Sequence, residues 1–244
     1  IVAALLGPTL ARVGAPILPQ EYLGTFLLIS VVSLLGAGVL LGLRPPAPIT
    51  SHRDTAEARP LPEIIRQPTY LVAVFGAATA YGVMVLAMTA TPLAMVHHNH
   101  EMASAATVIQ FHVLGMFLPS FFSGSLIARF GNLPIMLCGV GLLTAHVLIS
   151  LSGTDMGYFV SALALLGVGW NFLYVGATTL LTGTYTVAER GRAQATNDMT
   201  ILAIGLASSL GSGILLQTVG WQPMNAALLP WLGLAAAAII WLGV

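Results

Sequence analysis

The chain has 244 residues, of which 57% are hydrophobic and 7% are charged, and its formal net charge is zero. Because a soluble domain carries about 25% charged residues, a chain this apolar belongs to the membrane class. The lack of lysine and of net positive charge excludes a nucleic-acid partner. The single cysteine, Cys138, excludes a disulfide framework and a cysteine-based metal site within the chain.

The hydrophobic runs predict an all-α polytopic membrane protein, because each is about the 20 residues that a spanning helix needs. We expect one partial helix and about seven full transmembrane helices. The first residue is Ile1 and no signal peptide precedes the first run, so we expect a piece of a longer protein whose start is missing. The partial helix covers about 1–14, and the full spans are 21–43, 69–95, 104–128, 134–152, 157–184, 194–217 and 223–244.

Residues 44–68 are rich in proline and charge and predict an aqueous linker. Counting spans places this linker on the same side as the loops that hold Arg129, Arg190 and Arg192. Arg12 alone falls on the opposite side. By the positive-inside rule the linker side is cytoplasmic.

The span 69–95 carries a stripe with helical spacing that includes Tyr81 and Met88. Methionines in such a stripe usually pack in a core, but they also suit adaptable binding of apolar ligands. Tyr81 and Met88 are therefore candidates for a central cavity, with core packing as the alternative. The turn that follows, His97 to Glu101, predicts a solvated loop rather than a metal site, because its spacing fits no ligand motif. The other members of the stripe are Met84, Thr91 and Met95.

In the span 104–128, His112 shares a helical face with Met116. Ionisable residues at membrane depth are rare and usually face the interior, so both residues are cavity candidates. His112 could carry a proton or donate a hydrogen bond, and the alternative is a satisfied buried histidine. His146, in the leucine-rich span 134–152, is expected to be structural.

The span 157–184 has two faces. One holds Asn171, Tyr174 and Thr178, which are candidates for the cavity. The other holds Gly169, Gly176 and Gly183, whose seven-residue spacing predicts close packing against a neighbouring helix. The alternatives are an interhelical hydrogen bond for Asn171 and, for threonines such as Thr178, bonding to carbonyls of their own helix. Trp170 is expected to pack at the cavity wall, with a substrate contact through its indole N–H as the less favoured option.

Asp198 lies about two turns inside the span 194–217. It is a candidate either for proton coupling, with its charged form disfavoured by desolvation, or for a gate at the cytoplasmic end. Its position near that end favours the gate. Glu189, Arg190 and Arg192 predict a solvated loop, in which an ion pair across an interface is also conceivable.

Several segments together resemble the major facilitator superfamily, and in particular a group of its bacterial permeases with no settled substrate. The resemblance implies twelve helices in two six-helix halves joined by a cytoplasmic linker. Under it, 1–43 is the remnant of the N-terminal half, 44–68 is the central linker, and 69–244 is the C-terminal six-helix half. The segments are MTATPLAM (88–95), FHVLGMFLPSFFSG (111–124), LLGVGWNFLYVGATTLLTGTY (165–185) and AERGRAQATND (188–198).

Two short motifs of the family also have counterparts. Gly124, Arg129 and Gly131 match the cytoplasmic loop motif G-x-x-x-D-R-x-G, although Ala128 replaces its acidic residue. The pair Gly7-Pro8 resembles a glycine-proline motif that is common in exporters. For Arg129, neutralising the C-terminus of a helix is the alternative role.

The resemblance implies a secondary active transporter of a small organic molecule that works by alternating access in the bacterial inner membrane. Proton coupling through Asp198 or His112 and a lean toward efflux from Gly7-Pro8 are predicted, and the few inward charges favour a neutral or amphipathic substrate. The expected partners are that substrate, protons, the lipid bilayer and the N-terminal half. We expect no cofactor and no enzymatic activity, and no phosphate-binding loop for ATP is present. The alternatives are an intramembrane enzyme that uses His112 and Asp198, or a non-transporting sensor or assembly protein.

Overall fold

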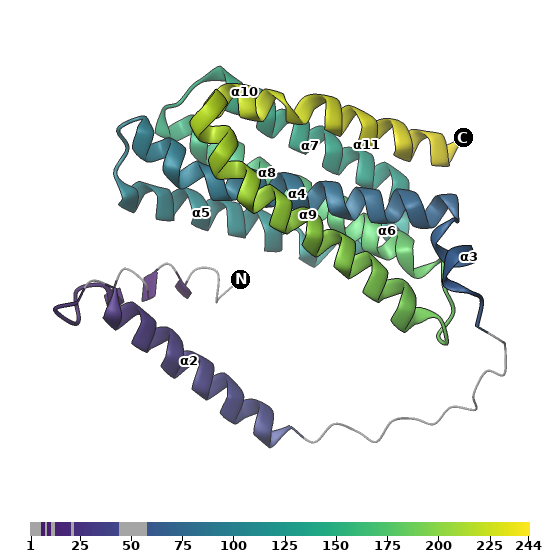
Figure 1. Ribbon diagram of the computed structural model, residues 1–244, viewed down its shortest axis with the longest axis horizontal. Coiled ribbons are helices and arrows are strands. Elements are labelled where there is room, and N and C mark those ends of the chain that lie inside the picture. Colours follow the sequence, from purple (N-terminus) through teal and green to yellow (C-terminus); the bar gives the residue numbers. More distant parts are fainter. Residues whose placement is uncertain (1–5, 8, 11–12, 21, 44–57) are drawn as a thin grey trace. The chain divides into compact units, whose positions relative to one another are not determined.

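The computed structural model describes residues 6–7, 9–10, 13–20, 22–43 and 58–244. The chain forms two compact units, residues 1–56 and 57–244. In the first unit, α2 (Leu23–Gly42) is purple in Figure 1. Most of the predicted partial helix lies outside the described residues, as do Pro8 of the glycine-proline motif, Arg12, and linker residues 44–57.

The second unit consists of helices throughout its described elements (Figure 1). They are α3 (Leu61–Ile65), α4 (Pro68–His97), α5 (Met102–Phe117), α6 (Ser120–Phe130), α7 (Asn132–Ser152), α8 (Met156–Thr182), α9 (Arg190–Val219), α10 (Trp221–Ala226) and α11 (Leu228–Gly243).

The predicted spans are confirmed. Among the described residues, seven helical segments are long and apolar enough to cross a membrane: 23–42, 68–97, 102–130, 132–152, 156–182, 190–219 and 221–243. Two of these segments are interrupted. The segment 102–130 is divided near Pro119 into α5 and α6, because proline lacks the N–H that continues a helix. The segment 221–243 is divided at Ala227 into α10 and α11.

Two glycines with positive φ separate spans that follow each other closely. Gly131, at φ 88°, joins α6 to α7, and Gly220, at φ 84°, joins α9 to α10. An L-residue with a side chain rarely adopts this conformation, so glycine is required where the chain reverses within one residue. Pro68 begins α4 at a position where the missing N–H has no helical partner to lose.

The core of the second unit forms around α8, which packs against α7, α5 and α4. Glycines allow two of these crossings to be close. Gly139 of α7 faces Gly169 and Leu173 of α8, and Gly167 of α8 faces the main chain of α5 at His112 and Gly115. The predicted packing role of Gly169 and Gly176 is confirmed, since both lie against α7, whereas Gly183 ends α8 and packs against no other helix.

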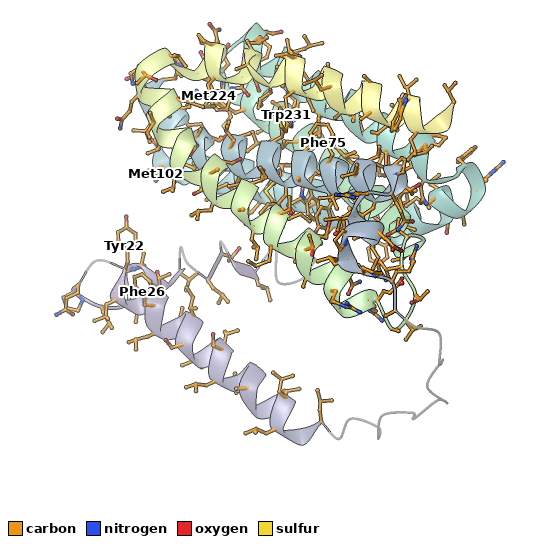
Figure 2. All side chains as sticks on the ribbon, turned by 45° about the vertical axis from the view of Figure 1, so that its right-hand side comes forward. Tyr22, Phe26, Phe75, Met102, Met224 and Trp231 are labelled. Carbon is orange, nitrogen blue, oxygen red and sulfur yellow. The ribbon has the colours of Figure 1, made fainter. Side chains whose placement is uncertain are left out.

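α11 covers α7 and α4 on another side of the core. Figure 2 labels Trp231 of α11 and Phe75 of α4, whose rings meet edge to face with centroids 5.2 Å apart. The Trp231 indole donates a hydrogen bond to Thr79 Oγ1 at 3.1 Å, which satisfies a polar group inside an apolar layer.

Candidate functional site

Polar and aromatic side chains on one face of α8 are half-exposed, namely those of Trp170, Tyr174 and Thr178. The rings of Trp170 and Tyr174, one turn apart, are stacked with centroids 4.8 Å apart and an interplanar angle of 11°. The Trp170 Nε1 atom is buried and has no acceptor among the described residues, so the ring presents mainly its apolar surface. Thr178 Oγ1 donates to Tyr174 O at 2.9 Å. This is a hydrogen bond to a carbonyl of its own helix, the alternative that the sequence left open for this threonine.

Tyr81 and Met88 of α4 are also half-buried. The Tyr81 ring lies directly over Gly205 of α9, where an added Cβ would stand 2.5 Å from the ring atom Cε1. Glycine at 205 therefore fixes Tyr81 between α4 and α9. The rest of the predicted stripe is core: Met84, Thr91 and Met95 are 8%, 0% and 0% exposed.

Asp198 is exposed on α9 and accepts a hydrogen bond from Asn197 Nδ2 at 3.0 Å. Asp198 and Tyr81 both interact electrostatically with Tyr174. The Tyr81 and Tyr174 hydroxyls have no hydrogen-bond partner among the described residues. Side chains from α4, α8 and α9 thus gather on one open side of the bundle, and we call Tyr81, Trp170, Tyr174 and Asp198 the open-side group.

Asn171 does not join this group. Its side chain is 1% exposed, and Nδ2 donates to Met116 O and to Ser120 Oγ, both at 2.8 Å. These hydrogen bonds connect α8 to the junction between α5 and α6. Of the two roles left open by the sequence, the structure shows the interhelical hydrogen bond, and Met116 participates through its main-chain oxygen.

His112 of α5 and His146 of α7 are both completely buried. The Nδ1 atom of His112 bonds Leu163 O at 3.1 Å, and that of His146 bonds Ala162 O at 2.9 Å. Both Nε2 atoms are buried without a partner among the described residues. Through Nδ1, these imidazoles link α5 and α7 to α8.

The loop-motif residues lie along α6 and at its junction with α7. Gly131 caps α6 by donating its N–H to Ile127 O at 2.8 Å. Arg129 is exposed in the last turn of α6, with its guanidinium 5.3 Å from the centre of the Phe130 ring. Gly124 is exposed and has open space around its Cα. No described carboxylate pairs with Arg129, so the placement fits neutralisation of the helix C-terminus.

The end of the linker is fixed to the loop between α8 and α9 by an ion pair. Arg59 Nη2 lies 2.8 Å from Glu189 Oε2, and Arg59 Nε and backbone N donate to Oε1 at 2.8 and 2.9 Å. Glu189 also accepts from Thr186 N at 2.9 Å. Arg59 Nη2 and Gln67 Nε2 both donate to Thr184 O at 3.0 Å.

The expectation of a solvated Glu189 is wrong, because its side chain is 1% exposed and paired with Arg59. The ion pair that was also conceivable is present. The Arg59 hydrogen bond, assisted by the backbone N–H of Thr186, holds the pKa of Glu189 well below its usual range. The partners lie 130 residues apart, so no local pattern could have identified them. Arg190 and Arg192 are exposed, as expected.

In the turn after α4, His100 is held inward. Its Nε2 lies 2.7 Å from Thr154 O, and its ring meets Phe159 edge to face. His97 and His98 line a hollow of about 450 Å³ together with Gln217 and Trp221. The prediction of a solvated loop therefore describes His97, Asn99 and Glu101, which are exposed, but not His100.

Comparison with known proteins identifies the family. Residues 73–244 match the sequence profile of the Major Facilitator Superfamily. The chain is 41% identical over 245 residues to the riboflavin transporter RfnT of Brucella anthropi, in an alignment that covers 98% of this chain and 61% of that protein. It is 38% identical over 135 residues to the uncharacterized MFS-type transporter YdeG of Bacillus subtilis, covering 54% of this chain and 31% of that protein.

A second Bacillus subtilis protein, the uncharacterized MFS-type transporter YddS, is 34% identical over 134 residues, with the same coverage of 54% and 31%. The chain spans less than two thirds of the length of each of these relatives. The profile match covers more than half of the chain, and the helices that it includes are long enough to span a bilayer. This multi-pass protein of the bacterial inner membrane therefore belongs to the major facilitator superfamily.

Proposed function

We propose that this chain is part of a secondary active transporter that moves a small organic molecule by alternating access. The observation that carries the proposal is the open-side group on α4, α8 and α9. Two tyrosine hydroxyls without described partners and an exposed carboxylate lie on helices of membrane-spanning length. Polar groups at such positions are costly in lipid and usually face a partner, a ligand or a water-filled path.

We propose further that residues 1–43 belong to an N-terminal half, that 44–68 is the cytoplasmic linker, and that 69–244 is the C-terminal six-helix half. Transporters of this kind bind substrate between two repeats. A site of that kind is open until the other half covers it, which agrees with the half-exposed state of Tyr81 and Tyr174. The ion pair of Arg59 and Glu189 would then fix the linker to the second half.

Asp198 is our candidate for proton coupling or gating, because it is the described acidic residue of the open side and can change charge there. His112 is less suited to that role, since it is fully buried and bonded to Leu163 O. The same burial argues against an enzyme built on His112 and Asp198. For the direction of transport we keep efflux, which the Gly7-Pro8 pair favours. Pro8 lies outside the described residues.

Riboflavin is the first substrate to test, because a relative that aligns with 98% of this chain is named a riboflavin transporter. Riboflavin is uncharged at neutral pH and amphipathic, which agrees with the expectation of a neutral or amphipathic substrate. Cavity candidates are Tyr81, Met88, Tyr174 and Thr178; Met116 and Asn171 would support the site from the α5–α8 contact.

The test is transport in vesicles that contain this chain joined to its N-terminal half. Radiolabelled riboflavin and a panel of small neutral organic molecules are followed with and without an imposed pH gradient. We expect flux of at least one compound that depends on the gradient. Absence of gradient-driven flux for every compound, in a protein shown to be folded, would overturn the proposal and favour a sensor or assembly role.

A further inference from the structure

The open-side group has the composition of a site for one class of molecule. We propose that it binds a planar conjugated ring that carries hydrogen-bond donors, with the ring extending the stack of Trp170 and Tyr174 and a donor directed to Asp198. This inference rests on the proposed transport function and names the substrate class of the same site. It also assigns separate roles to the aromatic and the acidic members of the group.

The aromatic part is preformed. Trp170 and Tyr174 stand one helical turn apart on α8, and their rings are within 11° of parallel at 4.8 Å. Both are half-exposed, so the pair offers apolar ring surface at the open side of the bundle. Ligand sites are commonly lined by aromatic surface with a few polar groups, and a flat ring can extend such a stack by lying on its outer face.

The polar part lies beside this wall on neighbouring helices. Tyr81 comes from α4 and is fixed by the close approach to Gly205, while Asp198 comes from α9. Asp198 and Tyr81 both lie within electrostatic range of Tyr174. The Tyr81 and Tyr174 hydroxyls can donate or accept, and the oxygens of Asp198 can accept. The set therefore matches a ligand whose ring bears N–H or O–H groups at its edge or on a side chain.

The negative charge of Asp198 should make the site select neutral ligands over anionic ones. The structure shows no basic partner for Asp198 among the described residues, since the ion pair present there joins Arg59 to Glu189. A phosphate or carboxylate on the ligand would meet a carboxylate that no described basic residue neutralises, and like charges repel. A neutral flavin should therefore bind better than its phosphorylated form.

The experiment measures binding to the purified protein, joined to its N-terminal half, in lipid nanodiscs. Riboflavin and riboflavin 5′-phosphate are titrated, and the quenching of flavin fluorescence by stacked aromatic rings reports binding. Because each substitution removes one ring of the stack, we expect Trp170→Ala and Tyr174→Leu each to weaken riboflavin binding about tenfold or more. Tyr174→Phe should retain most of the affinity, because it keeps the ring.

The matched control is Trp241→Ala, because Trp241 is 65% exposed on α11, which packs against α7 and α4. It should leave riboflavin affinity within about twofold of the wild type, well below the effect of losing a stacked ring. Riboflavin 5′-phosphate should bind the wild type about tenfold more weakly than riboflavin, and Asp198→Asn should narrow that difference, because it removes one repulsive charge. Circular dichroism and size-exclusion chromatography verify that each variant is folded.

Different results separate this inference from the proposed function. If folded Trp170→Ala and Tyr174→Leu bind riboflavin as tightly as the wild type, the aromatic wall is not the site. Equal affinity for the two flavins would overturn the charge argument. If the protein transports a compound without a conjugated ring and does not bind riboflavin, the inference fails while the proposed transport function stands.

Discussion

Replacing Gly139 with alanine tests how closely α7 and α8 cross. An added Cβ would lie 2.5 Å from Leu173 N and 2.9 Å from Gly169 O, whereas ordinary contacts begin near 3.4 Å, a shortfall of about 0.9 Å. Both obstructing atoms belong to the main chain of α8 and cannot rotate away. A gap of 0.5–1 Å forfeits about a quarter to a half of the dispersion energy of the atoms it separates.

Overpacking of this kind typically costs about 1–3 kcal/mol, and main-chain obstruction favours the upper part of that range. Alanine recovers about 0.5–1 kcal/mol through its better helix propensity. We therefore expect Gly139→Ala to lower the free energy of unfolding by about 1–2 kcal/mol. Gly141, two residues further along α7, has open space around its Cα and provides the control. Gly141→Ala should be neutral or stabilising by up to about 1 kcal/mol.

The assay is unfolding of the purified protein by titration of sodium dodecyl sulfate into mixed micelles, followed by far-ultraviolet circular dichroism. Wild type, Gly139→Ala and Gly141→Ala are compared at one lipid-to-detergent ratio. The reasoning would be refuted if Gly139→Ala were as stable as the wild type, because the clash at position 139 would then be absent. A loss in Gly141→Ala equal to that in Gly139→Ala would likewise indicate that any alanine in α7 is harmful.

Three further predictions concern single polar side chains. Arg59 holds the pKa of Glu189 below its ordinary value of 4.5, so the pair should stabilise the protein above about pH 4.5 and lose that contribution as the pH falls further. In a plot of melting temperature against pH, Glu189→Gln should therefore reduce the decline on the acid side. Asn171→Leu should cost about 0.6–1.7 kcal/mol of unfolding free energy in the same detergent titration, because it removes the hydrogen bonds from its amide to Met116 O of α5 and Ser120 Oγ of α6. Asp198→Asn should abolish flux driven by a pH gradient while exchange of substrate without a gradient continues; persistence of pH-driven flux would remove Asp198 from the coupling role.

The sequence by itself determined the spans and the glycine packing. Length and hydropathy are properties of a segment, so the seven spans agree with the structure to within a few residues. Helical spacing likewise placed Gly169 and Gly176 on one face, and that face packs against α7. Both features depend only on residues that are close to each other along the chain, so they can be predicted from the sequence alone.

Only the tertiary structure decided which polar side chains face the open side. In a soluble helix the apolar stripe shows which face is buried, but lipid and protein core are equally apolar, so that signal is lost in a membrane. Asn171 and Tyr174 share a predicted stripe, yet Asn171 is buried against Met116 O while Tyr174 remains half-exposed. The difference arises because α5 covers one part of that face and leaves the rest uncovered.

The ion pair of Arg59 and Glu189 depended on the tertiary structure in the same way. Each residue stands in a segment whose composition predicts exposure to water, and the folding of α3 beside α9 brings them together. A carboxylate can be buried there because an arginine and a backbone N–H satisfy its oxygens. Local sequence sets the helices and their packing glycines, while contacts between distant segments determine which charged and polar groups are paired and which stay open.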